Sequence, residues 1–144
     1  MKNIQPFHLA FPVHDLEESR SFYAGLLGCP TGRESKEWID FNLYGHQIVA
    51  HLAPAEDAAA TNKVDGENVP VRHFGVILEW DQWEKLAERL KGKVKFIIEP
   101  HVRFQGKPGE QATMFFKDPS GNALEFKAFR DFSNIFARQA HDEN

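Results

Sequence analysis

The feature that most constrains the fold of this 144-residue chain is an internal repeat. Residues 6–13 and 71–78 are apolar segments with the alternation of a β-strand, and each is followed by an acidic residue that starts a helix-capping pattern. Equivalent positions lie 64 to 66 residues apart, as in the pairs His8 and His73, Asp15 and Asp81, Glu18 and Glu84, and Gly28 and Gly92. The sequence therefore predicts two copies of one strand–helix unit, each helix ending at a glycine.

Further strands are predicted after each helix, at residues 38–43 and 47–52 in the first half and at 95–100, 112–116 and 123–129 in the second. The second helix carries one apolar stripe of the kind that packs on a sheet: Trp83, Leu86, Ala87 and Leu90. The pattern predicts an α+β protein with module 1 at about 4–53, a polar linker at 54–70, module 2 at about 71–129 and a C-terminal tail at 130–144. Residues 102–111 are interpreted as a solvated loop, and the tail is expected to add a helix through Ala137.

Size, charge and cysteine content exclude several classes of function. A chain of this length buries about 70% of its unfolded surface in one core, so a second independent domain is not expected. The net charge of -4 and the lack of a basic run argue against nucleic-acid binding. No apolar run reaches the roughly 20 residues that cross a bilayer, and Cys29, the single cysteine, cannot form an internal disulfide. We expect a cytoplasmic protein that binds a small molecule and no membrane.

Three potential metal ligands lie on strand faces that carry small neighbours. His8 shares its face with Ala10, His73 with Gly75, and Glu125 with Ala123, whereas bulky side chains occupy the opposite faces. Small neighbours leave space above a sheet, and two imidazoles with one carboxylate bind a divalent ion while leaving coordination positions open. His8 and His73 also occupy equivalent positions of the repeat. The sequence therefore predicts a metal site formed by His8, His73 and Glu125.

These residues resemble the vicinal-oxygen-chelate superfamily, which includes glyoxalases, extradiol dioxygenases and bleomycin-resistance proteins. The resemblance covers about residues 4–129 and is most specific in the segment 118–125, Asp-Pro-Ser-Gly-Asn-Ala-Leu-Glu. It implies two βαβββ modules whose mixed sheets curve into a metal-binding cup, formed within one chain or across a homodimer. It also implies that the first and last strands of each module are adjacent, so that His8 would neighbour His51 and His73 would neighbour Glu125. The three predicted ligands fall where the superfamily's common ligands fall.

By the same resemblance, His51 separates the candidate activities. Glyoxalases usually place a fourth ligand there, whereas extradiol dioxygenases use a histidine there as an acid–base group. The resemblance therefore favours a non-haem Fe(II) extradiol-type dioxygenase acting on a vicinal diol or catechol, with His51 as catalytic acid–base and no substrate-binding residue assigned. Phe115 departs from that pattern, because characterised extradiol enzymes have a tyrosine there. The alternatives are a glyoxalase-type lyase or isomerase using Ni, Zn or Mn, and a drug-binding resistance protein without catalysis.

Overall fold

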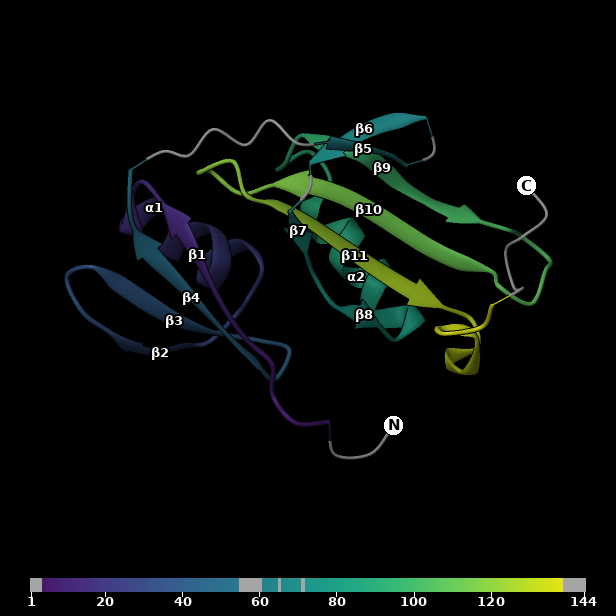
Figure 1. Ribbon diagram of the computed structural model, residues 1–144, viewed down its shortest axis with the longest axis horizontal. Coiled ribbons are helices and arrows are strands. Elements are labelled where there is room, and N and C mark those ends of the chain that lie inside the picture. The colour runs from purple at the N-terminus through teal and green to yellow at the C-terminus, as the bar shows by residue number, and fades with distance from the viewer. Residues whose placement is uncertain (1–3, 55–60, 65, 71, 139–144) are drawn as a thin grey trace. The chain divides into compact units, whose positions relative to one another are not determined.

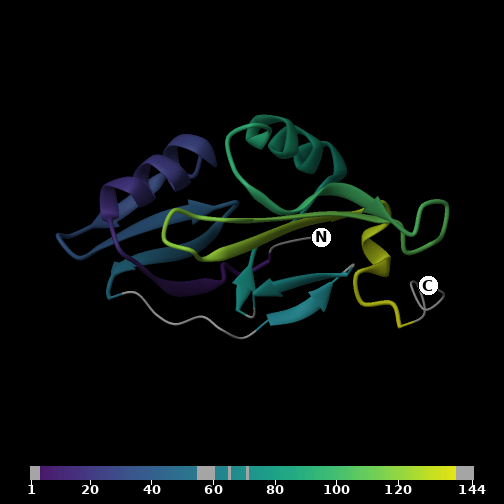
Figure 2. The ribbon, with the colours of Figure 1, turned by 90° about the horizontal axis from the view of Figure 1, so that it is seen from above.

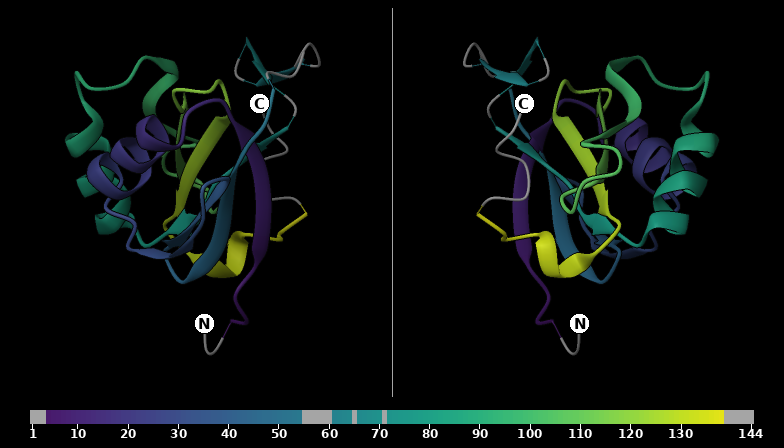
Figure 3. Two further views of the ribbon diagram at one scale, coloured as in Figure 1. Left: turned by 90° about the vertical axis from the view of Figure 1, so that its left-hand side faces the viewer. Right: turned by 90° about the vertical axis from the view of Figure 1, so that its right-hand side faces the viewer.

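The computed structural model describes residues 4–54, 61–64, 66–70 and 72–138, and the chain divides into two compact units (Figure 1). Unit 1 comprises Met1–Ala59 with Asp118–Asn122, and unit 2 comprises Ala60–Lys117 with Ala123–Asn144. Each unit is a sheet with a helix on one face, as the turned views show (Figures 2 and 3). The α+β class and the mixed sheets of βαβββ modules are confirmed.

Unit 1 has the elements β1 (His8–Val13), α1 (Leu16–Arg20), the π-helical turn η1 (Ser21–Leu26), β2 (Thr31–Glu34), β3 (Trp38–Leu43) and β4 (His46–Leu52). The strand order is β1-β4-β3-β2, in which β1 runs parallel to β4 and the other pairs are antiparallel. The predicted helix start is confirmed, because the Asp15 carboxylate accepts a hydrogen bond from the Glu18 backbone N–H at 2.9 Å. The short β2 was not predicted, because all four of its residues are exposed and the segment shows no alternation of apolar and polar side chains.

The turn 118–122, which belongs to unit 1, is held by a buried carboxylate. Asp118 is 4% exposed and accepts hydrogen bonds from the Tyr23 hydroxyl at 2.8 Å, from two backbone N–H groups of the turn, and from the Asn122 side-chain amide. The same amide donates to the Pro12 carbonyl at 2.8 Å. Tyr23 is fully buried among aromatic rings, so this part of the segment 118–125 is structural.

Unit 2 has the elements β5 (Thr61–Val64), β6 (Glu67–Pro70), β7 (His73–Phe74), β8 (Ile77–Leu78), α2 (Trp80–Leu90), β9 (Phe96–Arg103), β10 (Gln111–Lys117), β11 (Ala123–Phe129) and the 3-10 turn η2 (Phe132–Asn134). Its main sheet has the order β7-β11-β10-β9, and β8 pairs with the same strand β11. Both short strands run parallel to β11, whereas β10 is antiparallel to its neighbours. The side chains predicted to form the stripe of α2 are buried at Trp83, Leu86 and Leu90.

Several expectations for unit 2 were wrong in detail. The helix cap is Glu79 rather than Asp81, because the Glu79 N–H donates to the Gln82 side chain at 3.3 Å and the helix begins at Trp80. The expected linker contains the hairpin β5–β6, whose Val69 is fully buried in one cluster with Ile98 and Phe115.

Two further corrections concern the ends of unit 2. Strand β9 continues to Arg103, through the first residues of the predicted loop, because β10 supplies a partner for each of them. The tail forms only the single turn η2 among its described residues.

No helix in the described part of the chain is both long and apolar enough to cross a membrane.

Candidate metal centre

Two of the three predicted ligands meet in unit 2. Strand β7 pairs with β11 in the register His73 with Ala123, so Glu125 lies two residues further along β11, beside Gly75. The His73 Nε2 is 3.4 Å from the Glu125 Oε1. The two side chains are 29% and 15% exposed, so both are partly withdrawn from solvent. The implied adjacency of His73 and Glu125 is therefore confirmed.

Backbone chemistry fixes which nitrogen of His73 faces the carboxylate. The Nδ1 atom is 2.7 Å from the Pro70 carbonyl oxygen, and since a carbonyl can only accept, Nδ1 carries the proton. In a neutral ring, Nε2 then presents a lone pair to the Glu125 oxygen. Two acceptors this close repel each other unless a positive species is present, either a second proton on His73 or a metal ion. The donor set thus fits a divalent cation.

The other oxygen of Glu125 is held by Thr113 on β10. The Thr113 hydroxyl donates to the Glu125 Oε2 at 2.6 Å, and Thr113 is fully buried. Metal-binding residues commonly use their remaining polar atoms in this way, because the outer partner fixes the orientation of the ligand. Sequence reasoning missed Thr113. Strand alternation places Thr113 on the same face of the sheet as Phe115. However, no spacing in the sequence identifies Thr113 as a partner of Glu125.

Gly75 is required by a close approach of two backbones. A Cβ atom at this position would lie 1.6 Å from the Glu125 carbonyl oxygen, so no side chain fits between β11 and the break that separates β7 from β8. The two predicted ligands border a cavity of about 180 Å³, which is lined by His73, Phe74, Gly75, Val76, Ile77, Glu125 and Lys127. Because residue 75 has no side chain, the backbones of the two segments stay in contact beside His73 and Glu125.

Phe115 forms an aromatic wall of this centre. It lies opposite Glu125 in the β10–β11 register, is 1% exposed, and contacts the His73 ring edge-to-face with centroids 4.8 Å apart. This residue holds the imidazole by packing and supplies no hydroxyl at the position where the resemblance implied a tyrosine.

His8, in unit 1, is held by an amide. Its Nδ1 is 2.7 Å from the Gln47 Oε1, and the Gln47 Nε2 donates to the Asp40 carboxylate at 3.2 Å. With this assignment of the amide, Nδ1 of His8 carries the proton, as it does in His73, and Nε2 keeps its lone pair. The chain from carboxylate through amide to imidazole is typical of the outer partners of metal-binding histidines.

The expectation that His8 neighbours His51 was wrong. Strands β1 and β4 are adjacent as implied, but His8 lies opposite Gln47 and His51 lies opposite Pro12. The family resemblance implied this pair, whereas the register of two parallel strands depends on how they dock, and here it differs by four residues. His51 is exposed near the end of β4.

The register also identifies the counterpart of Glu125 in unit 1. In unit 2 the carboxylate stands two residues after the strand partner of His73. Two residues after Gln47, the strand partner of His8, stands Val49, which is 6% exposed. Valine has no atom that can coordinate a metal. The two units therefore differ at this position, one carrying a carboxylate and the other an aliphatic side chain.

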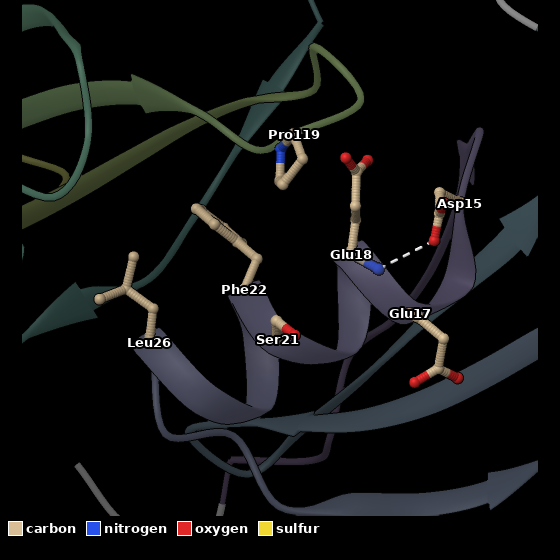
Figure 4. Close-up of a pocket in the computed structure, with 7 residues that line it drawn as sticks. All are labelled: Asp15, Glu17, Glu18, Ser21, Phe22, Leu26 and Pro119. Atoms are coloured by element: carbon tan, nitrogen blue, oxygen red, sulfur yellow. Dashed lines mark hydrogen bonds between the residues drawn. The ribbon is translucent and has the colours of Figure 1, made fainter.

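Across the described residues, no three of the His, Cys, Asp and Glu side chains form a cluster. A second cavity, in unit 1, has a volume of about 500 Å³ and is lined by Asp15, Glu17, Glu18, Ser21, Phe22, Leu26 and Pro119 (Figure 4). In Figure 4 the carboxylates of Glu17 and Glu18 point apart, and that of Asp15 caps the helix. The acidic groups of this groove are therefore not arranged to share one ion.

Comparisons with known proteins agree with this fold. One solved structure, a glyoxalase/bleomycin resistance protein/dioxygenase from Alicyclobacillus acidocaldarius, is 30% identical with a TM-score of 0.75, covering 94% of this chain and 100% of that one. A lactoylglutathione lyase from Agrobacterium tumefaciens is 14% identical (TM-score 0.60, 89% and 94% covered), and the fosfomycin resistance protein FosX from Listeria monocytogenes is 16% identical (TM-score 0.59, 89% and 93% covered). No curated protein matches the sequence.

The family assignment comes from a family model that matches residues 5–126. Proteins of that family typically bind divalent metal ions and small-molecule substrates, and many form dimers. The match spans most of both βαβββ units and every predicted ligand. This chain therefore belongs to the glyoxalase/bleomycin resistance protein/dioxygenase superfamily.

Proposed function

We propose that this protein is a metal-dependent enzyme that binds a small substrate through two neighbouring oxygen atoms, with His8, His73 and Glu125 as the ligands of a divalent ion. The observation that carries the proposal is the pair of acceptor atoms, His73 Nε2 and Glu125 Oε1, at 3.4 Å. The opposite atom of each ligand is already engaged, by the Pro70 carbonyl and the Thr113 hydroxyl. A bound ion would remove the repulsion between the two acceptors, act as a Lewis acid on the substrate oxygens and provide redox chemistry if it is iron.

The third ligand comes from the sequence repeat and from the family. His8 is equivalent to His73, and the Gln47 amide orients its ring in the same tautomer. In the proposed site His8 is supplied either by the same chain or by a second copy in a homodimer.

The number of protein ligands favours a dioxygenase of the extradiol type. Because Val49 stands at the counterpart of Glu125 and the Asp40 carboxylate accepts a hydrogen bond from the Gln47 amide, His8 is the one ligand that we propose from unit 1. Three protein ligands leave three positions on a six-coordinate ion, enough for both oxygens of a vicinal diol and for dioxygen, whereas a fourth ligand would leave two. We therefore favour Fe(II) and a catechol-like substrate over the four-ligand chemistry of a glyoxalase using Ni, Zn or Mn.

His51 is the proposed acid–base residue. It stands four residues from Gln47 along β4, about 13 Å at the rise of a strand. Retention of turnover and of its pH profile in His51→Ala would eliminate the role.

The first experiment measures metal binding. Calorimetric titration of the metal-free protein with Zn(II), a redox-inert probe, should show a tight site that His73→Ala and Glu125→Ala each abolish. His14→Ala is the matched control, because His14 forms a pair with Glu18 at 3.0 Å in which both side chains are 51% exposed. Equal affinity in wild type and His73→Ala would refute the proposal.

The second experiment separates the chemistries. Protein reconstituted anaerobically with Fe(II) is mixed with a panel of catechols, and oxygen uptake is followed together with the absorbance of ring-cleavage products. Uptake that depends on Glu125 supports the dioxygenase. A bound metal without oxygen uptake on any catechol would exclude it and leave the lyase or isomerase alternative.

A further inference from the structure

Lys127 is the one lysine or arginine, among the described residues, that borders the cavity of about 180 Å³ next to the proposed ligands. It stands two residues after Glu125 on β11, so both side chains project from the same face of the sheet. Its strand partner on β10 is Thr113, whose hydroxyl holds Glu125. The ammonium group is therefore placed at the next side-chain position along the face that carries the proposed metal site.

The position of Lys127 is fixed by its backbone and by an aromatic ring. Its backbone N–H donates to the Val76 carbonyl at 3.2 Å, and it pairs with Ile77 of β8. The Nζ atom lies 5.5 Å from the centre of the Phe129 ring, a buried side chain on the same face. Among the residues that the structure describes, no carboxylate forms an ion pair with this ammonium. The charge is thus available to a ligand in the cavity.

The charge balance of the site follows from these groups. A divalent ion bound by two neutral imidazoles and one carboxylate carries a net charge of +1, and Lys127 raises the local charge to +2. In a partly enclosed site such a charge favours a dianion. Two residues along a strand are about 7 Å apart. The flexible lysine side chain allows the ammonium group to lie nearer to Glu125 or farther from it than this backbone spacing.

We infer that the substrate carries an oxyanion group, a carboxylate or a phosphonate, in addition to its two metal-binding oxygens, and that Lys127 binds this group and so determines specificity. The inference rests on the proposed function, because the metal-binding end of the substrate is taken from it. It goes further in naming the charge of the substrate and the residue that recognises it.

The test is a binding measurement on Zn(II)-loaded protein, which carries out no oxygen chemistry. Catechol, 3,4-dihydroxybenzoate and 3,4-dihydroxybenzamide share the vicinal diol, and only the benzoate adds a negative charge. We expect wild type to bind the benzoate about tenfold more tightly than the other two, as one charge-assisted hydrogen bond provides. The preference should shrink at high salt.

Variants identify the residue responsible. Lys127→Met should abolish the preference for the benzoate over catechol and over the benzamide, whereas Lys127→Arg should retain the preference. Lys85→Met, which removes an exposed lysine from α2, is the matched control for net charge and should behave as wild type. The comparison of benzoate with benzamide on wild type needs no variant, so it tests the preference for a negative charge even if Lys127→Met does not fold, and the Lys127→Arg variant then tests the residue.

Three outcomes are distinguishable. A benzoate preference that disappears in Lys127→Met supports the inference. Equal affinities of all three diols for wild type, or a preference that survives in Lys127→Met, overturn it and leave the proposed function intact. Failure of every diol to bind the metal-loaded protein overturns both the proposed function and this inference.

Discussion

Replacing Gly75 by alanine should disrupt the proposed metal centre although it replaces none of the proposed ligands. The new Cβ would lie 1.6 Å from the Glu125 carbonyl oxygen and 2.6 Å from its carbonyl carbon, whereas real Cβ contacts essentially never fall under 3.0 Å. The difference between 3.0 and 1.6 Å means that the backbones must separate by at least about 1.4 Å at this point. Since the obstacle is backbone, no side-chain rotation can relieve the clash.

The separation would act on both stability and binding. It would weaken the pairing of β11 with β7 and β8, including the hydrogen bond from the Lys127 N–H to the Val76 carbonyl. Overpacking with the loss of one or two hydrogen bonds gives an expected cost of about 3 kcal/mol in the free energy of unfolding. It would also move His73 away from Glu125, and a displacement of this size should lower metal affinity by about 100-fold.

Urea unfolding followed by circular dichroism measures the first effect, and calorimetric titration with Zn(II) measures the second. Gly25→Ala is the matched control, because Gly25 lies in η1 and a Cβ atom added there would meet no heavy atom within 4 Å. That control should be neutral or stabilising by about 0.5 to 1 kcal/mol. If Gly75→Ala unfolds within about 0.5 kcal/mol of wild type and binds Zn(II) equally well, the close approach does not hold the centre together.

Three further predictions follow from buried polar groups. Tyr23→Phe removes the donor at 2.8 Å from Asp118 and should cost about 1.5 to 3 kcal/mol in urea unfolding; no change would mean that the remaining donors of the turn are sufficient. Thr113→Val should lower Zn(II) affinity by about 10- to 100-fold, whereas Thr113→Ser should restore it, and equal affinities would deny the hydroxyl a role. Burial raises the pKa of the Cys29 thiol from 9.0 to about 12, so the native state keeps a proton that the unfolded state releases between these values. The stabilising effect is complete below pH 9 and lost towards pH 12, so Cys29→Ala should flatten the decline in urea midpoint over this range; parallel profiles for the two proteins would contradict the shift.

The parts of the fold that depend on local pattern could be read from the sequence. Alternation alone predicts residues 38–43 and 123–129, the bounds found for β3 and β11. The spacing of Asp15 and Glu18 predicts the first helix start, since the cap is made within one turn. The hairpin β5–β6 shows little apolar alternation, because the stretch 61–69 is polar except for Val64 and Val69, and the sequence does not mark Val69 as the residue that is buried.

The candidate site was predictable in its residue types and not in its pairings. Strand alternation places His73 and Glu125 on faces with small neighbours, which suffices to name them. The partner of His73 is the Pro70 carbonyl, a backbone atom that every residue possesses and that no sequence pattern marks. The register of β1 with β4 is likewise set by docking of whole strands, and an error of four residues exchanged Gln47 for His51 as the neighbour of His8.

The two units share a sequence repeat but contribute unequally to the proposed metal site. In unit 2 the strand beside the histidine presents Ala123 and then Glu125, so the first position leaves room and the second supplies an oxygen. In unit 1 the corresponding positions hold Gln47, whose amide engages the imidazole, and Val49, which is buried. In the proposed site, an amide that orients a histidine and an aliphatic residue that cannot coordinate would together limit unit 1 to one ligand. Because the number of open positions on a metal sets which substrates and oxidants can bind together, the proposal makes this difference between the repeats, more than the shared histidines, the determinant of the chemistry.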